Sequence, residues 1–241
     1  MNYPQKLQAG ENVFPVTYEA SFKKTSSVRI KKNAVRIVLS RFLQGRKRDE
    51  TIEKFLGWAS KRLAKVSKVD FVSPIYEDGG RIVTHNKVYE LVVDVVVSDR
   101  ARARISEGNF LKIKIPAIWT VKDSQEKIKD LAEKLIIKDQ TPYLKEVLKE
   151  LNEVYFQLEF NGCRFKRMES RFGSCSTKRN INIAYRLLFA PREVFRYVCV
   201  HELAHLKEFN HSARFWDLVE SAMPNYKESE KWLRNSGFML G

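Results

Sequence analysis

The segment YVCVHELAHLKEFNHSARFW, residues 197–216, is the part of this 241-residue chain that decides its fold. It contains the pattern His-Glu-x-x-His at residues 201–205. Four residues span about one helical turn, so the imidazoles of His201 and His205 are expected to project from the same helix face. Glu202 lies about 100° around that helix, beside the two histidines. The spacing predicts one metal ion held between the imidazoles, with a carboxylate next to it.

His211 is the third candidate ligand, six residues after His205. Asn210 precedes it, and asparagine tolerates the left-handed geometry that ends a helix, so we expect the chain to fold back there. Three protein ligands leave the fourth zinc position open for water, which is typical of catalytic sites. The sequence therefore predicts Zn²⁺ at the three histidines, with Glu202 as the catalytic base that deprotonates a zinc-bound water.

The residues that precede this segment are expected to complete the site. Strands are predicted within residues 163–169, 172–176 and 180–190, followed by a helix over residues 191–209. We expect the strand NINIAYRLLFA to line the cleft and to pair with an extended substrate, with Asn182 and Tyr185 as candidate substrate-binding residues. Tyr185, Arg171 and Tyr226 are candidate donors to the negative charge that develops in the reaction.

Three stretches of this region resemble a known family: ESRFGSCS (residues 169–176), NINIAYRLLFAP (180–191) and the segment quoted first. In their order and spacing they resemble the YgjP-like metallopeptidases, predicted metal-dependent hydrolases related to the SprT-like zinc proteases. The resemblance implies the same metal ligands and the same catalytic glutamate, Glu202. One residue departs from the family pattern, since Phe172 stands where the family usually has tryptophan.

The N-terminal half reads as β-rich. Strands are predicted between residues 16 and 43, with a turn at Lys32-Asn33, and again over residues 81–98 and 109–116, after a turn at residues 78–80. A helix is predicted over residues 49–66, with Asp49 as its cap. Two further helices are predicted over residues 123–137 and 143–156. The expected fold is α+β: a β-rich accessory region (1–120), then a zincin-like catalytic domain (121–241) with a small sheet and the HExxH helix.

The net charge and the cysteine content limit the compartment and the binding partners that are expected for the chain. The chain carries a net charge of +15 and three cysteines, an odd number that favours a reducing compartment over a disulfide framework. We find no apolar leader or membrane-spanning run, so a cytoplasmic protein without a membrane partner is expected. Residues 1–50 carry 11 Lys and Arg against 4 Asp and Glu. This basic surface is either ordinary solvated lysine or a nucleic-acid contact.

The predicted activity is a zinc-dependent hydrolase, a metallopeptidase that cleaves amide bonds of a protein or peptide substrate. Two alternatives stay open. The motif fits a zinc hydrolase of a non-peptide amide or ester equally well, and the charge fits a basic nucleic-acid-binding module with a vestigial metal site.

Overall fold

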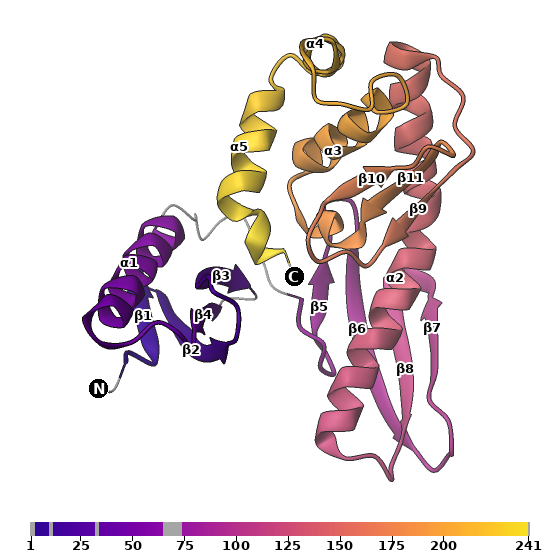
Figure 1. Cartoon of the computed structure of the whole chain (residues 1–241). Helices are drawn as coiled ribbons and strands as arrows, with labels where there is room; N and C mark the ends of the chain where they lie inside the picture. The colour runs from indigo at the N-terminus through magenta and orange to yellow at the C-terminus, as the bar shows by residue number, and fades with distance from the viewer. Residues whose placement is uncertain (1–2, 10–11, 32–33, 65–73, 241) are drawn as a thin grey trace. The chain divides into compact units, whose positions relative to one another are not determined.

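A computed structural model describes residues 3–9, 12–31, 34–64 and 74–240 of the chain (Figure 1). The chain forms two compact units: unit 1 comprises Met1–Phe71 and Lys231–Gly241, and unit 2 comprises Val72–Glu230. The predicted boundary near residue 120 lies within unit 2, between a strand and a helix. That residues 1–120 and 121–241 are separate domains stays a prediction.

Unit 1 is a four-stranded sheet with one packed helix. The strand order is β1-β2-β4-β3, in which β2 and β4 are parallel and the other pairs are antiparallel. The elements are β1 (Lys6–Ala9), β2 (Asn12–Ser21), β3 (Ser27–Lys31), β4 (Ala34–Ser40) and α1 (Gly45–Leu63). Alternate strand residues such as Val35 and Ile37 pack with Ile52 and Ala59 of α1 in one core.

Helix α1 begins four residues earlier than predicted. Gly45, with a φ of +54°, opens it in a conformation that glycine adopts without strain. Asp49 therefore lies inside the helix, where it accepts a hydrogen bond from the Tyr3 hydroxyl (2.9 Å), and does not cap it. The predicted turn at Lys32-Asn33 lies outside the described residues.

Unit 2 contains a second four-stranded sheet, with the order β5-β6-β8-β7. Its strands are β5 (Arg81–Val83), β6 (Val88–Val96), β7 (Arg102–Ser106) and β8 (Phe110–Pro116), and η2 (Glu107–Asn109) joins the last two. Strand β7 was not predicted, because its Arg-Ala-Arg start lacks apolar alternation. Leu111 and Ile113 of β8 are fully buried, and Lys112 and Lys114 point to the opposite face.

Helix α2 (Val121–Leu151) is one helix where the sequence predicted two. Pro142 lies inside it, and proline normally breaks a helix because it lacks an N–H and crowds the preceding turn. Here the Thr141 hydroxyl donates to the Ile137 carbonyl (2.6 Å) just before the proline. The helix ends at a π turn, η3 (Asn152–Phe156), after which Gln157 adopts a left-handed conformation.

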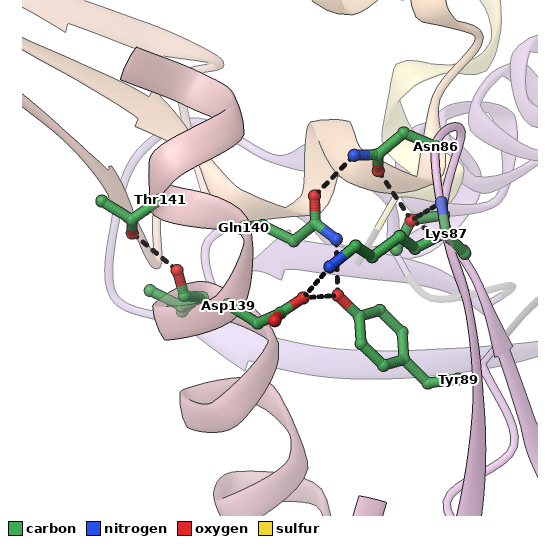
Figure 2. A network of polar contacts seen from close by, with 8 residues as sticks. Asn86, Lys87, Tyr89, Asp139, Gln140 and Thr141 are labelled. Atoms are coloured by element: carbon green, nitrogen blue, oxygen red, sulfur yellow. Dashed lines mark hydrogen bonds and ion pairs between the residues drawn. The ribbon is translucent and has the colours of Figure 1, made fainter. Parts of the chain in front are cut away.

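A buried polar network holds α2 on the N-terminal side of its proline (Figure 2). Asp139 accepts hydrogen bonds from Lys87 and from the Tyr89 hydroxyl, and Gln140 donates to the same hydroxyl. Asn86 donates to the Gln140 side-chain oxygen at 2.8 Å. Tyr89 and Gln140 are fully buried, so the bond between them is made in a low-dielectric interior where it is strong, whereas the Lys87–Asp139 pair is partly exposed. Tertiary contacts therefore keep the helix continuous past Pro142.

The third sheet and the C-terminal helices complete unit 2. The sheet has the order β10-β11-β9. The elements are β9 (Gly162–Lys166), β10 (Gly173–Cys175), β11 (Asn180–Ala184), η4 (Tyr185–Phe189), α3 (Arg192–Ala204), α4 (Ala213–Ala222), α5 (Tyr226–Ser236) and η5 (Gly237–Met239), of which the end of α5 and η5 belong to unit 1. Helix α2 contacts β7, β8, β9 and α3, so it runs past both sheets of this unit (Figure 1).

The mixed α and β content confirms the predicted α+β class. Among the described residues, no helix is both long and apolar enough to span a bilayer.

Candidate active site

Three imidazoles converge at the end of α3. The Nε2 atom of His201 lies 3.2 Å from that of His205 and 3.1 Å from that of His211. Helix α3 ends at Ala204, and His205 is its cap residue, so the two histidines of the His-Glu-x-x-His pattern share one face as predicted. His201, His205 and His211 form the one cluster of potential metal ligands in the part of the chain that the structure describes.

Two of the three nitrogen pairs in this cluster have the separation that a tetrahedral metal ion requires. Two nitrogens that each lie 2.0–2.1 Å from a zinc ion are about 3.3 Å apart, close to the 3.2 and 3.1 Å from His201 to His205 and His211, and all three ligand atoms lie within 4.8 Å of one another. Nδ1 of His205 is 3.0 Å from the Glu208 carbonyl oxygen, a contact that favours a proton on Nδ1 and leaves the Nε2 lone pair for a metal. Burial lowers the pKa of His201 to about 3, so its ring is neutral and able to coordinate.

Aromatic side chains of α4 hold the three rings in place. Phe215 is fully buried and its ring centroid lies 4.6–4.9 Å from the centroids of all three imidazoles. Trp216 stacks on His211, with centroids 5.8 Å apart, and also on Tyr226, with centroids 5.4 Å apart. The packed rings restrict the rotamers of the histidines, which pre-organises the cluster.

The chain returns to bring His211 into the cluster, but by a different route from the one predicted. The sequence predicted a helix to residue 209 and a left-handed Asn210; instead α3 ends at Ala204, and Asn210 is not among the residues with positive φ. Three-residue turn bonds from Leu206 to the Leu203 carbonyl and from Lys207 to the Ala204 carbonyl tighten the chain directly after the helix. His211 then precedes α4.

Glu202 is buried beside the histidines, with 4% of its surface exposed. Burial raises the pKa of its carboxyl to about 8, while the positive charge of Arg171 and a backbone hydrogen bond from Cys175 act less strongly in the opposite direction. The Oε2 atom has no hydrogen-bond partner among the described residues. The carboxylate therefore keeps an unused acceptor within the site.

Gly173 of β10 lies directly against this carboxylate. A Cβ atom at Gly173 would come 2.3 Å from Oε1 of Glu202 and 2.7 Å from its Cγ and Cδ atoms. A side chain at this position would therefore require the Glu202 carboxylate or the strand to move. This contact is not predictable from the sequence, because nothing in the spacing of Gly173 and Glu202 along the chain indicates that they touch.

Strand β10, and not β11, forms the free edge of the sheet beside α3. Strand β11 lies between β10 and β9, so both of its edges are already paired and the predicted pairing of β11 with a substrate is wrong. The amides of Ala184 and Ser176 bond to the carbonyls of Phe172 and Asn180, respectively. Backbone groups of the alternate residues on β10, Gly173 and Cys175, therefore point away from β11.

Arg186 ties down the loop that leads into β10. Its Nη2 atom donates to the carbonyl oxygens of Glu169 (3.2 Å) and Arg171 (3.4 Å). Its guanidinium carbon also lies 4.3 Å from the centroid of the Phe172 ring. The aromatic residue that replaces the family's tryptophan thus takes part in a cation–π contact. Sequence reasoning passed over Arg186, because an arginine that follows an apolar strand has no special signal.

The two predicted substrate-binding residues lie elsewhere in the sheet. Asn182 pairs with Ser174 across the strands, so it faces away from the side on which Gly173 meets Glu202. Its side chain bonds to Arg164 and Ser174. The Tyr185 hydroxyl lies 3.4 Å from that of Tyr76, and burial raises the pKa of Tyr185 above its usual range. Their contact with a substrate stays a prediction.

Two cysteines, Cys175 and Cys199, and the candidate donor Tyr226 have buried or half-buried surroundings. Burial and the negative charge of Glu202 raise the pKa of Cys175 to about 11, so its thiol is not activated, and Cys199 is completely buried. Tyr226 is buried in the aromatic stack with Trp216 and Tyr197.

Comparison with known proteins agrees with the site's chemistry. A family model described as "YgjP-like, metallopeptidase domain" matches residues 24–236. No curated protein matches the chain.

Two solved structures are similar to part of the chain. The metallopeptidase zymogen abylysin of Pyrococcus abyssi is 24% identical over 39% of this chain and 95% of its own, with a TM-score of 0.36. The metallopeptidase zymogen jannalysin of Methanocaldococcus jannaschii is 21% identical over 38% of this chain and 93% of its own, with a TM-score of 0.35.

Proposed function

Because the chain belongs to the YgjP-like metallopeptidase family, we propose that it is a zinc-dependent peptidase with Glu202 as its general base. His201, His205 and His211 would hold the metal. The observation that carries this proposal is the convergence of three Nε2 atoms, with separations of 3.1 and 3.2 Å, next to a buried carboxylate. The histidines match a zinc donor set with one position left for water or substrate.

The reaction follows from the groups that surround this point. A zinc ion bound by the three imidazoles would supply Lewis-acid polarisation and make water more acidic. Glu202 takes a proton from the attacking water at Oε2 and gives it to the nitrogen of the leaving amine. Burial helps in this role, because it raises the proton affinity of the Glu202 carboxylate. The expected products are a carboxylate and an amine.

The free edge of β10 is the proposed binding site for an extended peptide. Gly173 directs its amide and carbonyl away from β11 and adjoins Glu202, while the amide of Cys175 bonds to the Glu202 carboxylate and leaves the Cys175 carbonyl for pairing. A peptide that adds as a further strand would gain main-chain hydrogen bonds and would pass the carboxylate. This arrangement favours a peptide over a small non-peptide amide, which has no backbone to pair with β10. A zincin-like arrangement and a cytoplasmic location are parts of the same proposal.

The test compares two glutamates on one helix. Glu202→Gln removes the base with almost no change in volume, and Glu193→Gln makes the same change at an exposed position in the first turn of α3. We expect Glu202→Gln to retain zinc, measured by elemental analysis, and to lose at least about 1,000-fold in kcat/KM on a peptide library. Glu193→Gln should match the wild type. Full peptidase activity in Glu202→Gln would rule out the general-base role.

A further inference from the structure

The ends of two parallel strands in unit 1 bring two segments together that are far apart in the sequence. Strands β2 and β4 run in parallel, with Ser21 opposite Ser40, so the segments that follow the two strands leave the sheet at the same end. Phe22 follows β2 and Arg41 follows β4. The amide of Arg41 bonds to the Ser21 carbonyl (2.9 Å), which fixes the two exits side by side.

Two phenylalanine rings are exposed at this end of the sheet. The exposed fraction is 73% for Phe22 and 70% for Phe42, although rings of this size are normally buried in a core. The Arg41 guanidinium lies 4.2 Å from the centroid of the Phe22 ring, so one aromatic face is already paired with a cation. These rings are not part of the core of unit 1, which is formed by other residues.

Positive charge surrounds the two rings. The segments 22–24 and 41–48 contain six Lys and Arg residues and no Asp or Glu. Arg46 pairs with Glu50, but both side chains are largely exposed, so the pair contributes little. No other ion pair is found for these six cations within the described part of unit 1. The other five, Lys23, Lys24, Arg41, Lys47 and Arg48, therefore have no ion-pair partner in that part of the chain.

These cations do not serve the stability of α1. Arg46, Lys47 and Arg48 occupy its first turn, which has no acidic residue and no side-chain cap from Gln44. A helix N-terminus carries a partial positive charge, so cations there are destabilising. Their position in the first turn is therefore not explained by helix stability.

We propose that this surface, made of Phe22–Lys24 and Arg41–Arg48, binds single-stranded nucleic acid. Phosphates would lie against the cations, and unpaired bases would stack on the two exposed rings. The combination of an electropositive strip with aromatic platforms is the one by which single strands are held without sequence preference. The inference concerns unit 1 and does not depend on the peptidase activity proposed for unit 2.

An anionic membrane is a less suitable partner for the same side chains. The rings are carried by strand ends and a loop, so insertion would take unpaired backbone groups out of water. The apolar side chains of α1, Ile52, Ala59 and Leu63, are buried in the core of unit 1 and are not available as a lipid-facing stripe.

The experiment measures the binding of the full chain, with Glu202→Gln to prevent proteolysis, to a fluorescent 20-nucleotide oligo(dT). Anisotropy is recorded at several salt concentrations. We expect the logarithm of the affinity to fall with the logarithm of the salt concentration with a slope of about −4, as six phosphate contacts predict. Phe22→Ala combined with Phe42→Ala should weaken binding by about 10- to 100-fold while leaving that slope unchanged, because stacking is not electrostatic.

Two variants that remove the same number of positive charges separate the effect of this surface on binding from the effect of the overall charge. The first variant replaces Lys23, Lys24, Arg46 and Lys47 by Gln. The control replaces Arg102, Arg104, Lys112 and Lys114 by Gln, four cations on the outer face of the β7–β8 pair that lack exposed rings beside them. We expect the first variant to reduce the salt slope by about 3, and the control to reduce it by less than about 1.

Three results would overturn the proposal: equal losses in both quadruple variants, unchanged affinity in the double phenylalanine variant, or tighter binding to a duplex of equal length than to the single strand. Ring-dependent binding to phosphatidylserine vesicles without binding to oligo(dT) would also overturn it and assign the surface to a membrane. Circular dichroism of each variant checks that the fold is retained.

Discussion

The contact between Gly173 and Glu202 allows the catalytic proposal to be tested by a single methyl group. In Gly173→Ala the new Cβ atom would lie 2.3 Å from Oε1, whereas ordinary contacts begin at 3.4 Å. The carboxylate, the strand or both must therefore move by about 1 Å. A displacement of this size at a reacting group costs about 100-fold in rate. Overpacking at a buried site should also lower the free energy of unfolding by about 1–3 kcal/mol.

The assay is kcat/KM on a peptide library, with zinc content measured on the same samples. Gly162→Ala in β9 is the matched control, because its Cβ would meet Asn180 Oδ1 at 3.5 Å, an ordinary contact. We expect Gly173→Ala to keep its zinc and lose about 100-fold in kcat/KM, and Gly162→Ala to retain wild-type activity. If Gly173→Ala is folded and as active as the control, the contact with Gly173 does not position Glu202.

Further predictions concern the surroundings of the site. Arg186→Ala frees the loop at Phe172, so kcat/KM should fall by about 10-fold at unchanged zinc content, and Arg186→Lys should restore less than half of the loss because an ammonium group lacks the planar face that stacks on the Phe172 ring. Burial lowers the pKa of His85 to about 4. The unfolded state therefore binds an additional proton below about pH 6.5, and stability should drop between pH 6.5 and 4 by up to about 3 kcal/mol, measured by urea unfolding. In His85→Leu this part of the slope should disappear. Asp139→Asn breaks the ion pair with Lys87 and should lower the free energy of unfolding by about 1–3 kcal/mol, measured in the same way, with no effect on zinc content.

The histidine cluster was predictable because its main signal is local. The four-residue spacing of His201 and His205 fixes their common face through helix geometry alone. The place of His211 was predicted correctly, but its route was not, because the turn after Ala204 depends on packing against α4 and not on the preference of Asn210. Zinc itself and the role of Glu202 stay predictions.

The fold was less predictable where distant residues override local rules. Pro142 favours two helices, yet contacts of Asp139 and Gln140 with the β5–β6 turn keep α2 continuous. The order of strands in the third sheet is likewise a property of tertiary pairing, since nothing in the short sequences of β9, β10 and β11 indicates which strand lies between the other two. For this reason the strand predicted to pair with a substrate was β11, and the contact of Gly173 with Glu202 was not predicted.

The most direct test of the metal site is the zinc content of the purified chain, measured by elemental analysis beside His211→Ala and the neighbouring control Asn210→Ala. The proposed site predicts about one zinc per chain in the wild type and in the control, and a large loss in His211→Ala, because three ligands are needed to hold the ion. A wild-type chain without metal after purification in zinc-containing buffer, or a His211→Ala variant with a full zinc complement, would contradict the three-histidine centre.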